Sequence, residues 1–323
     1  MFNVKREVSM AFERIKPFVR ETMLDYSLPL SNLLGCQAFL KCENLQYTGS
    51  FKVRGAFNKL LALTSSERLQ EVTTASTGNH GAAVAFGLNK LKIPGLVFVP
   101  ENASKTKVDN ILNYHIPLKH YGNDCMITEL YAREYAVKNH MIYISPYNDL
   151  EVIGGQGTIA IELMKQLNNI DAIFVPIGGG GLISGIAGYL KETAPHIKII
   201  GCLPENSPVM AESIHAGRIL DIETKETLSD ATAGGMEPGS ITFEICQKYV
   251  DDYILVSENE IKQAIIAMIK NQHLLIEGAA GVALAALFKS ASQFQNKNVV
   301  VILSGANISL ENLSSVLDYY ENN

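Results

Sequence analysis

The sequence predicts an α/β protein with open parallel sheets, each covered by helices on both faces. Three observations predict this fold class. From about residue 72, short apolar runs alternate with longer segments of helical spacing. The last of these runs, Asn298–Leu303, is continuously apolar after its first residue, as expected of a parallel strand buried on both faces. With 323 residues, the chain is long enough for two such units or one large one, because single cores stop growing near ~250–300 residues.

The predicted strands and helices alternate along the chain, which is typical of right-handed βαβ units. The predicted strands are short and rich in β-branched residues. They are Val72–Ser76, Gly95–Pro100, Pro117–Gly122, Met141–Pro146, Ala172–Ile177, Lys198–Leu203, Asp252–Ser257 and Asn298–Leu303. The helices are Gly78–Leu91, Ser104–Asn113, Asp124–Asn139, Gly155–Leu167, Gly181–Thr193, Glu258–Gln272 and Glu277–Ser290. No Pro/Ser-rich linker separates two domains, so any division must lie where the chain crosses between compact units.

Composition narrows the class of protein. The formal net charge is −6 and no dense Lys/Arg run occurs, which argues against a nucleic-acid partner. The five cysteines are scattered without a Cys-x-x-Cys pair, so neither a zinc site nor a disulfide framework is indicated. No secretory signal and no apolar run of ~20 residues is found, so we expect a cytoplasmic protein without a membrane partner.

The clearest local motif is a run of four glycines, Gly178–Gly181, between the apolar run Ile173–Ile177 and a helical pattern. Glycines fold tightly and expose backbone N–H groups, and a helix N-terminus adds a partial positive charge, so the run predicts a phosphate cradle. A flexible turn is the alternative. No frame gives Gly-x-Gly-x-x-Gly and the chain has no Gly-Lys dipeptide, so a single small phosphate suits the loop better than a nucleotide.

Lys52 is the second candidate. Most lysines are solvated surface residues, but this one follows Phe51 and opens an apolar helical pattern. Desolvation would lower the pKa of its amine and make it a nucleophile towards aldehydes.

Two further motifs follow predicted strands. Ser76–Gly81 offers hydroxyls, an amide and backbone N–H groups at a helix start, which suits a carboxylate, with simple helix capping as the alternative. His80 in this run could equally be structural. Ser304 follows the last strand, where ligands of parallel sheets bind, although a lone serine there is usually a turn residue.

Together and in this order, the four motifs resemble the fold-type II pyridoxal-phosphate family, which has the tryptophan-synthase-β-like fold of two open three-layer domains. The resemblance runs from Pro29 to about Asn307. The run Lys41–Gln46, with Ser50–Gly55 and Gly155–Thr158, is similar to the threonine/serine dehydratase and serine racemase branch.

The resemblance implies roles in holding pyridoxal 5′-phosphate. Lys52 would carry the cofactor as a Schiff base and later move the α-proton. Phe51 would pack near the ring, Asn79 would bond its 3′-oxygen, and Ser304 would face its pyridine nitrogen, which suits β-elimination over transamination. The phosphate would be held by Gly178, Gly179, Gly180, Gly181 and Leu182.

The resemblance also implies a substrate site for a small hydroxy amino acid. Its residues would be Ser76, Thr77, Gly78, His80, Gly235 and Glu277. Thr77 stands where racemases of this branch place a serine as second base, so a catalytic role for its hydroxyl is open. Tyr147 stands where dehydratases often carry Phe and racemases Asn, which favours elimination.

Two departures from the branch concern a metal and the substrate. Metal-binding members carry acids where this chain has Leu203 and Val209, so we expect no metal at that site, although Glu205 is nearby. The segment Ala233–Ser240 resembles dehydratase-type enzymes associated with hydroxyectoine breakdown.

The expected activity is a carbon–nitrogen lyase that converts L-threonine or L-serine to a 2-oxo acid and ammonia. Alternatives are a dehydratase of another 3-hydroxy amino acid, a serine racemase, or a non-catalytic phosphate-ligand or nucleotide-binding protein of the same architecture. We expect a large cofactor-binding domain of residues 1–68 and 149–323, a small mobile substrate-binding domain of residues 69–148, and a homodimer, the usual default.

Overall fold

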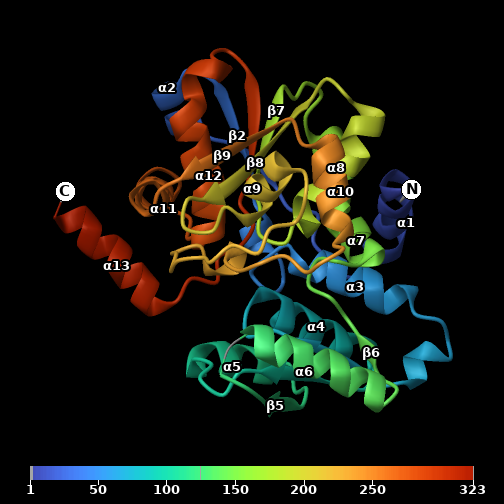
Figure 1. The fold of residues 1–323 in the computed structure, drawn as a ribbon. Coiled ribbons are helices and arrows are strands. Elements are labelled where there is room, and N and C mark those ends of the chain that lie inside the picture. Colours follow the sequence, from blue (N-terminus) through green and yellow to red (C-terminus); the bar gives the residue numbers. More distant parts are fainter. Residues whose placement is uncertain (1–2, 124, 323) are drawn as a thin grey trace.

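The computed structural model describes residues 3–123 and 125–322, and these contain two separate sheets. The six-stranded sheet has the order β1-β2-β10-β7-β8-β9, and the four-stranded sheet has the order β5-β4-β3-β6. Figure 1 shows the six-stranded sheet in the upper part and the second sheet with α4, α5 and α6 below it. All neighbours pair in parallel except β1, which runs antiparallel to β2.

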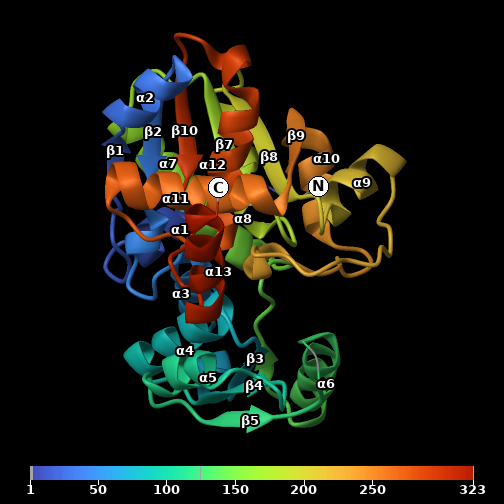
Figure 2. The same ribbon diagram turned by 90° about the vertical axis from the view of Figure 1, so that its left-hand side faces the viewer.

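The large sheet joins strands from both halves of the chain. Its members are β1 (Leu24–Tyr26), β2 (Gln37–Lys41), β7 (Ala172–Pro176), β8 (Lys198–Pro204), β9 (Asp252–Val256) and β10 (Asn298–Ile302). Figure 2 shows β10 between β2 and β7. Val299–Ile302 of β10 are fully buried, as a parallel strand with helices on both sides requires.

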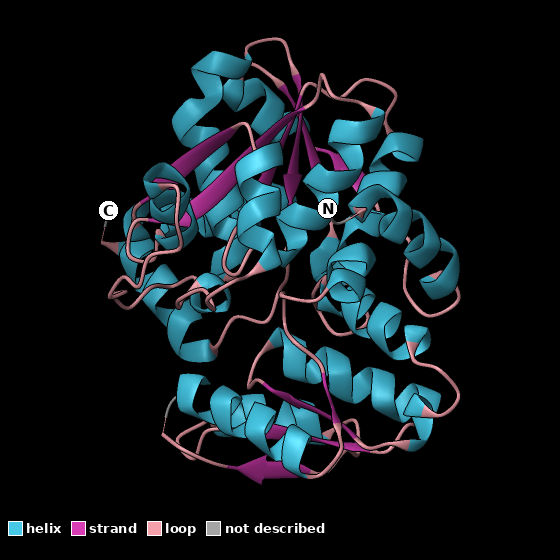
Figure 3. Ribbon diagram, turned by 45° about the vertical axis from the view of Figure 1, so that its right-hand side comes forward, coloured by secondary structure: helices cyan, strands magenta, loops and turns pink. Residues whose placement is uncertain are grey.

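Helices cover both faces of the large sheet (Figure 3). The core on one face includes residues of α2 (Leu28–Leu34), α11 (Glu258–Gln272) and α12 (Gly278–Ser290). The core on the other face includes α7 (Leu150–Gln166), α8 (Gly181–Thr193) and α10 (Ile241–Tyr249). The remaining helices of this part are α1 (Val4–Ile15), α3 (Lys52–Ala62), α9 (Val209–Ala216) and α13 (Leu310–Glu321).

The small sheet is built from one continuous stretch of chain. Its strands are β3 (Val72–Ala75), β4 (Gly95–Val99), β5 (Leu118–His120) and β6 (Ile142–Tyr143). Its helices are α4 (Asn79–Leu91), α5 (Lys105–Leu112) and α6 (Cys125–Lys138). The helix expected from Asp124 is present, but Asp124 itself lies outside the described residues.

The predicted elements are present, but several differ in extent: β5 and β6 are shorter than the predicted Pro117–Gly122 and Met141–Pro146, and α7 starts earlier than predicted. The sequence predicts a helix from Gly155, but α7 begins at Leu150 and is capped by Asp149, whose side chain accepts from the Val152 N–H. The predicted start failed because Gly154 and Gly155 disfavour a helix interior. A Cβ at Gly155 would lie 2.5 Å from the Arg54 carbonyl oxygen, so close packing against α3 requires the glycine there.

The topology places several loops at one edge of the large sheet. Strands β2, β10 and β7 are parallel neighbours, so their carboxyl ends face the same way. The loops that follow them lead to Lys52, to Ser304 and to Gly178–Gly181. Ligands of open parallel sheets bind at this kind of edge. In the described part of the chain, no helix is long and apolar enough to cross a membrane.

Candidate active site

Lys52 lies at the first position of α3, with its amine directed to the segment that leaves the small sheet. Its Nζ donates to the Pro146 carbonyl oxygen at 2.8 Å and lies 5.3 Å from the centre of the Phe51 ring. Burial lowers the pKa of Lys52 to about 8, against an opposing effect of the Glu277 carboxylate. An amine with a pKa of about 8 is half uncharged at mildly alkaline pH, and the uncharged form can attack an aldehyde.

The helix that carries Lys52, α3, is held in place by a buried network of four charged residues: Lys41, Glu43, Arg54 and Glu162. The Arg54 guanidinium donates to both Glu43 oxygens at 2.8 Å and to Glu162 Oε1 at 2.6 Å. Lys41 Nζ lies 2.6 Å from Glu162 Oε2. The charges balance, and each carboxylate has a cation, as burial of charge demands.

The Gly178–Gly181 loop ends β7 and opens α8 as the sequence predicts. Gly180 has φ of +85°, a conformation that favours glycine. A Cβ at Gly178 would lie 2.9 Å from Thr232 Cα, and one at Gly179 would overlap the Tyr147 ring. Among the described residues, the N–H groups of positions 179–183 have no protein acceptor, so they are available to an anion.

Ser304 provides a buried hydroxyl without a partner. Ser304 is 1% exposed, and its Oγ makes no hydrogen bond to any described group. Since an unsatisfied buried hydroxyl is costly, it indicates a ligand atom at this position. An amine of lowered pKa, free N–H groups at a helix start and this hydroxyl therefore fit pyridoxal phosphate.

The loop after β3, which leads to Asn79, contacts the segment before α12 near Ser304. Asn79 Nδ2 donates to both oxygens of Glu277, at 3.0 and 2.9 Å, which joins the small sheet to the segment before α12. Burial raises the pKa of Glu277 to about 7, while the Asn79 amide opposes this. Leu182 is buried in the first turn of α8, and Ser76 accepts a hydrogen bond from the Gly78 N–H at 3.2 Å.

His80 is buried, and burial together with Lys52 lowers its pKa to about 3, so the ring is neutral. Its Nε2 donates to the Ile144 carbonyl oxygen at 3.2 Å, whereas Nδ1 has no partner among the described residues. Thr77 is half-buried in the loop. Gly235 differs from the others, because it is exposed and a Cβ there would meet nothing within 4 Å.

Sequence reasoning missed Asn307 as a site residue. Its Nδ2 donates to Asn79 Oδ1 at 2.6 Å, and its backbone N–H donates to Glu277 Oε2 at 3.2 Å. The available signal was a second polar side chain, three residues after Ser304, in the loop that follows β10.

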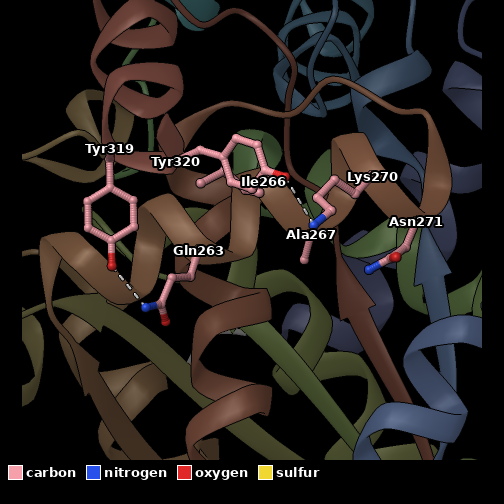
Figure 4. A pocket seen from close by; sticks show the side chains of 7 residues that line it. All are labelled: Gln263, Ile266, Ala267, Lys270, Asn271, Tyr319 and Tyr320. Atoms are coloured by element: carbon pink, nitrogen blue, oxygen red, sulfur yellow. Dashed lines mark hydrogen bonds between the residues drawn. The ribbon is translucent and has the colours of Figure 1, made fainter. Parts of the chain in front are cut away.

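A surface pocket of about 350 Å³ lies between α11 and α13 (Figure 4). It contains none of the residues above, and its lining is Gln263, Ile266, Ala267, Lys270, Asn271, Tyr319 and Tyr320. In the described part of the chain, no group of three His, Cys, Asp or Glu side chains could hold a metal ion.

The fold and this site define an enzyme that uses a phosphorylated aldehyde as its cofactor. The chain belongs to the family of pyridoxal-phosphate dependent enzymes, whose family model matches residues 15–305. This confirms the predicted family, fold class and cofactor.

Similar proteins lie within the same branch. The chain is 39% identical over 317 residues to the catabolic L-threonine dehydratase TdcB of Escherichia coli strain K12, covering 98% of this chain and 96% of that protein. Its structure is similar to the processed form of threonine deaminase isoform 2 from Solanum lycopersicum, with a TM-score of 0.95, 32% identity, and coverage of 99% and 89%. The serine racemase of Dictyostelium discoideum gives a TM-score of 0.87 at 33% identity, with coverage of 94% and 98%.

The lowered pKa of Lys52 predicts its reactivity towards an acylating reagent. Only the uncharged amine reacts, so labelling of the cofactor-free protein should rise with pH and reach half its maximum near pH 8, not near 10.5. A brief acetic anhydride pulse at a series of pH values, followed by peptide mass spectrometry, measures this. The exposed Lys16 is the internal control, and a Lys52 profile that matches that of Lys16 would contradict the buried environment.

Proposed function

We propose that the protein is a carbon–nitrogen lyase that converts L-threonine or L-serine to a 2-oxo acid and ammonia. The observation that carries this is the placement of the Lys52 amine and the unpartnered Ser304 hydroxyl at the same sheet edge as the glycine loop. The catabolic L-threonine dehydratase named above, 39% identical over 98% of this chain, supports the substrate class.

Different residues of the chain have different roles in the proposed reaction. Bound pyridoxal phosphate supplies the electron sink that stabilises the charge left when a substrate loses its α-proton. Lys52 Nζ would bind the aldehyde, would be released as a free amine when the substrate amine takes its place, and would then accept the α-proton. The N–H groups after Gly178 bind the phosphate, and the Ser304 hydroxyl faces the ring nitrogen without protonating it. The Ser76–His80 loop receives the substrate carboxylate.

An assay over a panel of amino acids tests this assignment. Purified holoenzyme is expected to release ammonia and a 2-oxo acid from threonine or serine. Inversion of serine without ammonia would instead show a racemase, for which the half-buried Thr77 hydroxyl would be the second base. Activity confined to another 3-hydroxy amino acid would assign the chain to the alternative that the Ala233–Ser240 segment suggests.

We further propose that residues 69–148 form a small domain that moves against residues 1–68 and 149–323. Two ion pairs that join these parts support this: Arg133 Nη2 to Glu237 at 3.1 Å and Lys107 Nζ to Asp230 at 2.7 Å. All four side chains are partly exposed, so each pair contributes little and can open readily. Hydrogen exchange should slow in the linking segments when serine binds, and unchanged exchange would argue for a rigid protein.

We also expect a cytoplasmic homodimer, the commonest closed assembly. Light scattering on a sizing column tests the assembly, where a mass near 35.3 kDa would show a monomer instead.

Activity is expected to survive removal of divalent metals. Leu203 and Val209 are buried apolar residues at the positions where metal-binding members of the branch carry acids, and neither can ligate a hard cation. Ammonia release should therefore be unchanged within error after treatment with EDTA. A strong loss that magnesium restores would show a metal site elsewhere in the chain.

A further inference from the structure

The Glu277 carboxylate is held in one place although it has no ion-pair partner among the described residues. It is 2% exposed and accepts from the Asn79 side chain and from the Asn307 backbone. A Cβ at Gly305 would lie 2.5 Å from Glu277 Oε1, so the carboxylate fills space that glycine leaves. The Glu277 N–H also donates to the Gly305 carbonyl oxygen at 3.0 Å.

This carboxylate and Asn307 together determine which way the Asn79 amide points. Asn79 Oδ1 faces the Asn307 NH₂, which can only donate, and Asn79 Nδ2 faces the Glu277 oxygens, which accept from it. The Asn307 NH₂ is itself oriented by the Thr48 carbonyl oxygen at 2.9 Å. A flipped Asn79 amide would place oxygen against oxygen and NH₂ against NH₂, so the observed orientation is strongly favoured.

The same geometry leaves one Asn79 hydrogen free. The two hydrogens of a planar amide diverge too widely to reach both oxygens of one carboxylate, so the nearly equal distances of 3.0 and 2.9 Å indicate one N–H shared between the two oxygens. The second N–H is directed elsewhere with its orientation fixed. The side chain of Glu277 is thereby engaged with two asparagines.

We propose that Glu277, with Asn307, is a positioning residue that holds the Asn79 amide so that its second N–H meets the 3′-oxygen of the cofactor. This rests on the proposed function and on the contact with the 3′-oxygen that the resemblance implies for Asn79, and it differs from the expected substrate-binding role of Glu277. It concerns the cofactor's hydrogen bonding, so it makes predictions about the resting enzyme before any substrate is added.

The test is a double-mutant cycle on the holoenzyme, read from the cofactor's absorption. A hydrogen bond to the 3′-oxygen alters the balance between the visible and near-ultraviolet bands. Glu277→Gln and Asn79→Ala should change the band ratio in the same direction and weaken cofactor binding ~3- to 10-fold each. The double variant should match Asn79→Ala, because Glu277 acts through Asn79.

Two further variants complete the experiment, the first as a control and the second as an independent test. Glu7→Gln removes a carboxylate that also accepts from an asparagine amide, Asn58 at 3.0 Å, but lies on α1, and it should leave the spectrum unchanged. Asn307→Ala leaves the Glu277 carboxylate in place and should shift the band ratio in the same direction, so the proposal stays testable if Glu277→Gln does not fold.

Additive effects in the cycle would overturn the proposal. So would an unchanged spectrum of Glu277→Gln combined with a raised KM, since that would mean direct substrate contact. The cycle needs no turnover. A wild-type protein that holds the cofactor but acts on neither threonine nor serine would therefore overturn the proposed substrate class and leave the conclusion about Glu277 intact.

Discussion

Lys52→Ala is expected to abolish covalent retention of the cofactor and to lower the elimination rate by at least ~10⁴-fold. The variant loses both the amine that binds the aldehyde and the base that takes the α-proton. Borohydride treatment should fix the cofactor to the wild-type peptide that contains Lys52, and to no peptide of the variant. The measurements are intact and peptide mass spectrometry together with the rate of ammonia release.

The matched controls separate chemistry from folding. Lys90→Ala changes an exposed lysine at the end of α4 and should keep wild-type activity. Lys52→Arg keeps a cation at the position but cannot attack an aldehyde at working pH, so it should be as inactive as Lys52→Ala. Substantial activity in either Lys52 variant, with the cofactor fixed at another lysine, would show that the assignment is wrong.

Arg54→Ala is expected to lower the free energy of unfolding by about 3–5 kcal/mol. The change leaves the buried Glu43 and Glu162 carboxylates with only Lys41 as a cation, and removes the bonds from the guanidinium to both of them. Most of the expected loss in the free energy of unfolding comes from leaving buried carboxylates without their cation. The loss of the packing contacts of the Arg54 side chain alone would cost less. Because Arg54 lies in the first turn of α3, cofactor retention at Lys52 should weaken as well.

Urea unfolding followed by circular dichroism, with the same excess of cofactor for each variant, measures this effect. Arg218→Ala, an exposed arginine after α9, should change stability by less than ~0.5 kcal/mol. A loss below ~1 kcal/mol for Arg54→Ala would mean that water reaches the carboxylates and that the network is not closed.

The sequence was most informative where local chemistry determines structure. The glycine loop, the strand before it and the helix after it follow from short-range rules, and so does the run Asn298–Leu303. The orientation of Asn79 could not be predicted in this way, because it depends on Glu277 and Asn307, which lie 198 and 228 positions away. Contacts of this separation leave no periodic pattern in the sequence.

The early part of the chain shows the same limit. The predicted strand list omitted β2, whose place beside β10 depends on a partner at the far end of the chain. The early start of α7 also depends on tertiary packing, because its glycines are unfavourable for an isolated helix and are required by close contact with α3 and α8. In both cases a distant neighbour outweighed local preference.

The pairing of β2 with β10 has a consequence for how the chain is made. The four-stranded sheet spans one continuous stretch and can form on a growing chain, but β2 gains its parallel neighbour only after β10 has been synthesised. We expect proteolysis of ribosome-bound chains of increasing length to show protection of residues 72–143 first, and of β2 only after residue 302 has emerged. Protection of residues 72–143 and of β2 at the same chain length would contradict this order. A premature stop before β10 would therefore leave an early strand, made hundreds of residues before, paired only with β1.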